Sequence, residues 1–194
     1  MNKWKLPTSL VVGEVAFDIR TDYRVVLGIY HYLNDPDYTD DEKWAIALRS
    51  FYIDIDKMSP DMYDEAAVKM LDFFRCGATP SDDDKGRPPT MDWDQDADII
   101  IPAVNKVAGY DVRGVDHLHW WTFFSYYMEI TEGVFATVVG IRNKQVRGKK
   151  LDEHEKDFVR DNPSLVFLQK HKTEEELRQE AEDKAALAAL FGER

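Results

Sequence analysis

The sequence has a single cysteine, Cys76, among its 194 residues. One cysteine excludes an internal disulfide framework and the cysteine-clustered zinc sites of small metal-binding domains. Long apolar runs are also missing, because no segment approaches the roughly 18 unbroken apolar residues of a membrane span. The first residues lead into Pro7 and Thr8 rather than into an apolar signal core, so no secretion signal is expected. A reducing compartment fits these absences, and we expect a cytoplasmic protein.

Sequence signatures of catalysis are absent as well. The chain has no glycine-rich phosphate loop, no Gly-x-Ser-x-Gly motif, and no candidate nucleophile beside a base. Cys76 lies between Arg75 and Gly77 at the expected end of a helix, where the helix dipole does not lower the pKa of a thiol. We therefore expect a protein without catalytic residues or cofactors, in which Cys76 is a small buried residue.

Charge of one sign dominates the composition. Hydrophobic residues make up 44% and charged residues 32%, which is typical of a globular chain and argues against wholesale disorder. The 25 Lys and Arg residues against 37 Asp and Glu residues give a net charge of 25 − 37 = −12. A chain this acidic repels phosphate backbones and anionic membranes overall, although a local basic patch stays compatible with it. The length suits one domain, with room for an appendage.

The segment from Ser9 to Ile19 predicts a β-hairpin. Two short apolar runs, 10–12 and 15–17, flank the dipeptide Gly13-Glu14. Glycine at the first of two loop positions suits a type II′ turn, because glycine tolerates a positive φ. We expect two short strands here and little other sheet in the protein.

Helix signals dominate the rest of the chain, because apolar residues recur at helical spacing and capping residues precede several of the segments. The expected helices begin after Thr21, at the capping box Thr39–Glu42, at Ser59-Pro60, near Asp92, after Asp116, at Val134 and after Leu151-Asp152. Gly77 is the expected C′ stop of the third helix. Pro102 lies inside the fourth helix, which runs to Gly109, and should kink or split it.

Two segments between these signals have an unusual composition. Residues 78–90 hold three prolines, one glycine and three consecutive aspartates without a large apolar residue, which indicates a mobile surface loop. The expected helix from His117 to Ile130 is aromatic almost all round, which is typical of a central, buried helix. A platform for stacking nucleobases is the alternative, and we favour the core because no basic residue is interleaved with the aromatics.

The tail has a different character. A second capping box, Thr173–Glu176, precedes a segment rich in strong helix formers with a narrow apolar edge that includes Leu177, Leu187 and Leu190. We expect a solvated helix that projects from the core or meets a partner helix, and a frayed terminal helix is the alternative. The predicted fold is mainly α: a compact helical domain over residues 1–170 with a short N-terminal β-hairpin, and a C-terminal helical extension over residues 171–194.

Two groups of residues of the types that bind metals do not predict a metal site. Acids alternate from Asp92 to Asp98, but a calcium loop also needs glycine at its sixth position and glutamate at its twelfth, and neither register supplies them. Acids in the first turn of a helix explain the run without a metal. His117 and His119 are two residues apart and point to different faces of a helix, unlike helical zinc ligands. We expect no metal site, and interpret the histidines as helix-start residues beside an aromatic core.

One basic stretch interrupts the acidic chain. It runs from Arg142 to Lys150 and contains Arg142, Lys144, Arg147, Lys149 and Lys150 without an acid. This is the one stretch suited to contact nucleic acid. Acids at 152, 153, 155 and 157 neutralise part of it, so we favour a solvated link or an electrostatic contact with an acidic protein surface.

Several stretches spread along the chain form a recognisable set. They are Leu6-Pro7 and residues 19–24, 33–36, 39–43, 92–97, 119–123, 128–130, 141–144 and 148–152. Together they resemble the bacteriophage "gene product fifteen" family of siphophages and Gram-positive prophages, from about Leu6 to about Leu168. Pro102 and the loop 81–89 depart from the family pattern, and the terminal helix lies beyond the matching region.

The resemblance implies a function. Genes of this family typically lie between the tail tube and tape-measure genes, where long-tailed phages encode tail assembly chaperones. Such proteins coat the tape measure, keep its long helices soluble, and leave as tube subunits polymerise. The implied partner is the tape-measure protein, with the tail tube protein, another tail chaperone and a second copy of the chain as further candidates. The implied location is the cytoplasm of the bacterial host rather than the mature virion.

The chemistry of the chain fits this role in a general way. Long amphipathic helices aggregate when uncovered, and a partner with net negative charge and apolar grooves suppresses that aggregation. The expected partner-binding residues are Trp4, Trp44, Arg142, Lys144, Arg147, Leu177, Leu187 and Leu190. Two other functions stay open: a structural tail component retained in the virion, and a nucleic-acid-binding phage regulator that uses residues 142–150.

Overall fold

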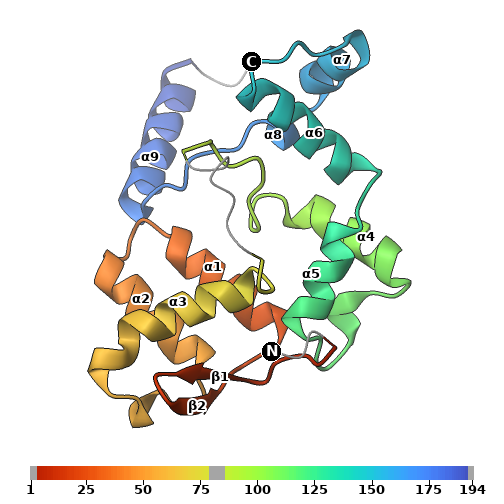
Figure 1. Ribbon diagram of the computed structural model, residues 1–194. Coiled ribbons are helices and arrows are strands. Elements are labelled where there is room, and N and C mark those ends of the chain that lie inside the picture. The colour runs from red at the N-terminus through yellow and green to blue at the C-terminus, as the bar shows by residue number, and fades with distance from the viewer. Residues whose placement is uncertain (1–3, 79–85, 192–194) are drawn as a thin grey trace.

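The protein is described by a computed structural model that covers residues 4–78 and 86–191, the last six of these by their backbone alone (Figure 1). Its elements in chain order are β1 (Ser9–Val12), β2 (Val15–Asp18), α1 (Tyr23–Asn34), α2 (Asp40–Phe51), η1 (Ile55–Lys57), η2 (Pro60–Met62), α3 (Tyr63–Phe74), α4 (Ala97–Ala108), η4 (Val112–Gly114), α5 (Trp120–Met128), α6 (Val134–Val146), α7 (Glu153–Asp161), α8 (Pro163–Val166) and α9 (Glu174–Phe191). Within the described residues the sheet is one two-stranded hairpin. The predicted mainly α fold with a short N-terminal hairpin is confirmed.

The hairpin forms as its sequence predicts. Strands β1 and β2 pair antiparallel, with Val12 opposite Val15 across the two-residue turn. Gly13 has a φ of 60° and Glu14 has no positive φ, which is the pattern of a type II′ turn. The backbone N–H of Gly13 donates to Oε2 of Glu65 at 3.0 Å, which ties the turn to α3.

Capping boxes start three helices. Thr39 accepts from the backbone of Glu42, and the Glu42 carboxylate accepts from the backbone of Thr39 at 2.9 Å, as predicted for α2. The same reciprocal pair starts α7 at Asp152 and α9 at Thr173. Each box satisfies backbone donors that a helix start otherwise leaves free, so these boundaries follow from local sequence alone.

Two other helix starts were misplaced by the sequence. Helix α1 is capped by Asp22, whose carboxylate accepts from the backbone of Arg24 at 2.9 Å, and not by Thr21. Helix α5 begins at Trp120 with His119 as its cap, and not after Asp116. At Thr21 the hydroxyl is engaged by a distant residue, since it lies 3.0 Å from Nε2 of His117. At Asp116 the backbone N–H of Leu118, which a cap at Asp116 would bind, donates instead to Oδ2 of Asp22 at 3.0 Å.

Helix α4 also differs from its prediction. It starts at Ala97 rather than near Asp92, because Asp92 caps a preceding turn by accepting from the backbone of Asp94 and Gln95. The helix runs unbroken through Pro102 to Gly109, which has a φ of 79°, so the proline does not split it. The predicted loop 78–90 includes residues 79–85, which lie outside the described residues, and its described part, 86–90, has no helix or strand.

The end of α3 is a Schellman motif with an unexpected residue in its left-handed position. The backbone N–H of Gly77 donates to the carbonyl of Asp72, and that of Cys76 donates to the carbonyl of Phe73, each at 2.9 Å. In this motif Cys76 occupies C′, the position predicted for Gly77, and it has a φ of 54°. Cys76 is half-buried, and burial raises the pKa of its thiol to about 12.

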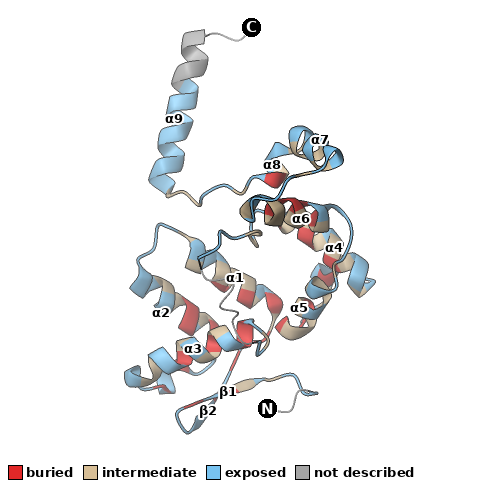
Figure 2. Cartoon of the chain, turned by 45° about the horizontal axis from the view of Figure 1, so that its top comes forward, coloured by how far each residue is buried: buried red, intermediate tan, exposed pale blue. Residues whose placement is uncertain are grey.

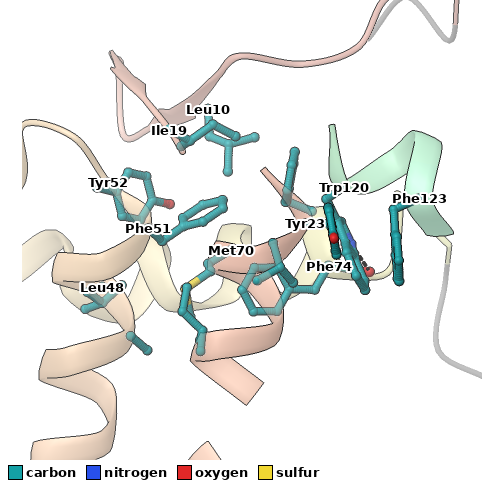
Figure 3. Packing of buried hydrophobic residues seen from close by; sticks show 14 of the residues in the cluster. Leu10, Ile19, Tyr23, Leu48, Phe51, Tyr52, Met70, Phe74, Trp120 and Phe123 are labelled. Carbon is teal, nitrogen blue, oxygen red and sulfur yellow. Dashed lines mark hydrogen bonds between the residues drawn. The ribbon is translucent and has the colours of Figure 1, made fainter. Parts of the chain in front are cut away.

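One core joins the hairpin to the first five helices. Figure 3 shows Leu10 and Ile19 from the hairpin region above Phe51, Met70 and other side chains of the helices. Trp120 is fully buried and donates its indole N–H to the carbonyl of Phe74 at 2.9 Å. The aromatic helix α5 therefore lies in the core, as predicted, with its flanking rings half-buried.

Helix α9 stands apart from this core. Figure 2 shows it extending away from the other helices, exposed along the part whose side chains are described. From Glu174 to Ala185 every side chain is exposed. The base of the helix is held where the backbone N–H of Glu174 donates to Oδ2 of Asp37 at 2.8 Å. In the described part of the chain, no helix is long and apolar enough to cross a membrane.

Candidate protein-binding groove

An open groove lies between α2 and α3, with a volume of about 550 Å³. Helix α2 contributes Asp41, Trp44, Ala45, Leu48 and Arg49, and the α3 side contributes Tyr63, Asp64, Ala67, Val68 and Leu71, with Ile55 between them. Both rows repeat at alternating intervals of three and one, so each is one face of a helix. The groove is therefore made of two helical stripes that face a common space.

The depth of the groove has a simple origin in residue size. Ala45 and Ala67 lie in the middle of the two rows, where larger side chains precede and follow them. The most buried lining residues, Leu48 and Ile55, form its floor and belong to the core. Two small residues between larger ones leave a hollow that neither helix fills.

Large apolar side chains form the walls of the groove and remain in contact with solvent. Trp44 is 38% exposed and Val68 is 57% exposed. Apolar side chains gathered along an open hollow are typical of sites that bind another protein. The exposed lining of this groove is mostly apolar.

The rim of the groove is acidic. The carboxylates of Asp41 and Asp64 form no ion pair with the described residues, whereas Arg49 faces Asp56 at 3.9 Å. The helix starts add to this charge, because Asp40 and Glu42 flank Asp41 in the first turn of α2. The rim therefore offers carboxylates that a positively charged ligand can reach.

Behind the groove, a hydrogen bond and aromatic contacts join α2 to α3. Tyr52, fully buried at the end of α2, donates its hydroxyl to the carbonyl of Ala66 in α3 at 2.9 Å. Burial raises the pKa of Tyr52, so the hydroxyl stays a neutral donor. This hydrogen bond and the ring contacts of Phe51 fix the spacing of the two helices that line the groove.

The expected partner-binding residues are not brought together. Trp44 lies in the groove wall, whereas Trp4 is 96% exposed near the N-terminus and is not among the lining residues. Leu177 is exposed near the base of α9 and lines a separate hollow beside Asp37 and His171. The side chains of Leu187 and Leu190 lie outside the described residues.

The predicted basic strip is smaller than its sequence indicates. Arg142 is buried, and Lys144 forms an ion pair with Glu155, one of the acids expected to neutralise the strip. Arg147, Lys149 and Lys150 are exposed at and after the end of α6. The prediction that Arg142 binds a partner protein is wrong, because its side chain is buried against Asp96.

Arg142 pairs with Asp96 in the interior. Its Nη1 lies 2.7 Å and its Nη2 2.9 Å from the two carboxylate oxygens, and both side chains are more than nine-tenths buried. The remaining donors of the guanidinium bond the carbonyls of Thr90, Leu165 and Val166. This pair was missed by the sequence analysis, because its partners are 46 positions apart and each resembles a surface charge in its local context.

His119 lies at a helix start beside the aromatic core, as the sequence predicts, whereas His117 is exposed and lies before α5. His119 accepts the backbone N–H of Trp121 on Nδ1 at 3.1 Å, and its Nε2 lies 3.0 Å from the carbonyl of Pro7. Burial lowers the pKa of His119, which favours the neutral ring that this arrangement requires. Among the residues described, no group of three or more His, Cys, Asp or Glu residues is placed to hold a metal ion.

The acidic run 92–98 is divided among separate partners. Asp92 lies 2.7 Å from Nε2 of His171, Asp94 lies 2.9 Å from Nδ1 of His31, and Asp96 faces Arg142. Each carboxylate therefore points to a different neighbour, and the three do not form a shared ligand set. The expectation that these acids lie in the first turn of a helix holds only for Asp98, because α4 begins at Ala97 with Asp96 as its N-cap.

Comparison with known proteins gives one match. A protein-family model described as "Bacteriophage Gp15 protein" matches residues 3–167. No curated protein and no solved structure matches the chain. The matched region includes both walls of the groove and the Arg142–Asp96 pair, and it ends before α9 begins.

Proposed function

The chain belongs to the Bacteriophage Gp15 protein family, and from that membership we propose that it is a non-catalytic tail assembly chaperone of a long-tailed phage. Its partner is the tape-measure protein, which it keeps soluble while the tail tube assembles. Family membership is the observation that carries this proposal, because genes of the family typically lie between the tail tube and tape-measure genes. The host cytoplasm is the proposed location.

The physical chemistry of the chain supports this role. A tape-measure protein presents long amphipathic helices whose apolar faces need cover before they assemble. The groove between α2 and α3 offers an open apolar surface of the kind that binds such a face. The net charge of −12 favours solubility of a complex between the two proteins.

Co-expression with the tape-measure protein of the same phage tests the proposal. The tape-measure protein is expected in the insoluble fraction alone, and in the soluble fraction, co-purifying with the tagged chain, when the two are expressed together. An unrelated acidic protein of similar size serves as the control for general effects of charge. If solubility is unchanged and the two never co-purify, the chaperone role is wrong.

Peptide mass spectrometry of purified particles separates the chaperone from a structural tail component. A chaperone leaves before the virion is complete, so its peptides should be absent or far below those of the tail tube protein. Recovery of the chain in fixed stoichiometry with the tube protein contradicts the chaperone role and supports a structural one.

A further inference from the structure

We propose that the groove between α2 and α3 binds a single amphipathic helix of a partner protein, with a short aliphatic stripe flanked by lysine or arginine side chains. The inference rests on the proposed function in one respect, since it describes the partner segment that a tail chaperone would recognise. The shape, the apolar walls and the charge of the groove point to this ligand independently of that function.

The length of the groove sets the length of the stripe. Its α2 row runs from Asp41 to Arg49, and eight residues of helix span about 12 Å at about 1.5 Å a residue. A bound helix lying along this row presents about two turns to the groove. Its aliphatic anchors therefore fall at positions i, i+3 or i+4, and i+7, the spacing of helices that bind in grooves.

The walls of the groove suit aliphatic anchors rather than a polar ligand. Trp44 and Val68 stand at its two sides, and both are substantially exposed. The floor between them is made of Leu48 and Ile55, so a side chain that enters meets apolar atoms on each side. Covering these side chains removes apolar surface from water, which stabilises a complex by about 25 cal/mol for each Å².

The charge of the rim selects the flanks of the bound helix. Asp41 and Asp64 have no ion pair with described residues, and Arg49 already faces Asp56. A lysine or arginine beside the aliphatic stripe reaches these carboxylates, and the face of Trp44 offers a cation–π contact to the same groups. A glutamate in the same place meets two like charges.

The first part of α9 of a second copy does not fit the groove, because it carries charge of the same sign. Between Glu174 and Ala185, helix α9 carries Glu174, Glu175, Glu176, Glu180, Glu182 and Asp183 against Arg178 and Lys184. An acidic helix in an acidic groove is repelled, and its apolar edge over this stretch offers Leu177 as the one large side chain. The acidic part of α9 of a second copy is therefore not the occupant.

Two designed peptides test the inference directly. Both are 14-residue helices with the same leucine stripe, and they differ only in whether lysine or glutamate flanks the stripe. Fluorescence anisotropy of the labelled peptides should give about tenfold tighter binding of the lysine peptide at low salt, from two exposed ion pairs. This preference should shrink as the salt rises toward about 0.5 M, because exposed charges are screened.

Variants of the full chain place the binding in the groove. The double substitution Asp41→Lys with Asp64→Lys should reverse the preference, so that the glutamate peptide binds more tightly than the lysine peptide. Asp40→Lys is the matched control, because Asp40 lies in the same first turn of α2 and does not line the groove. Val68→Glu, at an exposed position, should weaken both peptides at least tenfold while circular dichroism shows an intact fold.

Each outcome decides the inference separately from the chaperone role. If neither peptide binds, if both bind equally, or if Val68→Glu binds as well as the wild type, the inference is wrong even when the tape-measure protein co-purifies. If the wild type forms a dimer that Val68→Glu abolishes, the groove binds a second copy and the inference is again wrong. If the lysine peptide binds as described while the tape-measure protein does not, the inference about the groove is confirmed and the chaperone role is wrong.

Discussion

The carboxylate of Asp96 and the guanidinium of Arg142 meet face to face, with contacts of 2.7 and 2.9 Å, in the interior between α4, α6 and α8. The carbonyls of Leu165 and Val166 occupy further donors of the same guanidinium. One arginine therefore bonds the turn before α4 to the short helix α8. At this point α4, α6 and α8 are therefore joined by polar bonds.

Substitution of Arg142 tests this role. Arg142→Leu leaves the Asp96 carboxylate buried without its partner, and loss of one member of a buried pair typically costs about 3–5 kcal/mol. Urea unfolding should report a loss of this size. Arg147→Leu, at an exposed position in the same basic stretch, should change the free energy of unfolding by less than about 0.5 kcal/mol. Equal effects of the two substitutions contradict the assignment.

Acid should destabilise the protein through His119. Burial holds the pKa of this ring below its ordinary value near 6.5, so the unfolded chain binds a proton that the folded chain resists. The stability is therefore fully present above about pH 6.5 and falls as the pH drops below it. Protonation also removes the Nδ1 acceptor that caps α5 at Trp121.

The substitution His119→Asn isolates this effect, because asparagine caps helices well and does not titrate. Urea unfolding of the wild type and the variant at intervals from pH 8 to pH 5.5 should give a smaller pH dependence in the variant. Parallel curves for the two proteins show that His119 does not contribute.

Cys76 should be replaceable by glycine without loss of stability. A left-handed conformation costs a residue with a side chain about 1–2 kcal/mol, and glycine avoids this cost while losing the half-buried thiol contact. We expect Cys76→Gly to have the stability of the wild type or to exceed it by up to about 1 kcal/mol. Cys76→Val, with a β-branched side chain in the same conformation, should be less stable than both. Thermal unfolding of the three proteins checks this order.

The two threonine caps should give different results when each is replaced by alanine. Thr39→Ala removes a capping box from α2, which packs in the core, and should cost about 1 kcal/mol in global unfolding. Thr173→Ala removes the equivalent box from α9, whose described side chains are exposed, and should leave global unfolding unchanged. Amide hydrogen exchange should instead show faster exchange in α9. Loss of global stability in Thr173→Ala means that α9 packs on the core.

Local sequence signals predicted local structure well. The type II′ turn at Gly13, the capping boxes and the start of α6 depend on residues within a few positions of one another, and the structure confirms them. The errors at Thr21 and Asp116 arose where a distant partner changed which residue caps the helix. Asp22 shows this directly, because its carboxylate also accepts the backbone N–H of Leu118, 96 positions away.

The groove and the buried ion pair could not be predicted from local sequence patterns. Trp44, Ala45 and Leu48 appear in the sequence as one apolar stripe of a helix, with no signal that Trp44 faces a hollow while Leu48 joins the core. Ala45 and Ala67, which both line the groove, were the available signal in the sequence. They indicate a hollow only when α2 and α3 are known to be adjacent. Arg142 likewise resembles its basic neighbours in the sequence, and only its contact with Asp96 in the structure distinguishes it.

The position of Trp44 also makes the protein its own optical probe. Its indole lies in the groove wall at 38% exposure, whereas the indole of Trp120 is fully enclosed. A ligand that covers the groove should shift the Trp44 emission to shorter wavelength and shield it from acrylamide, while Trp120 emits as before. In a Trp4→Phe background, which removes the most exposed indole, occupancy of the groove becomes a spectroscopic signal that needs no attached dye.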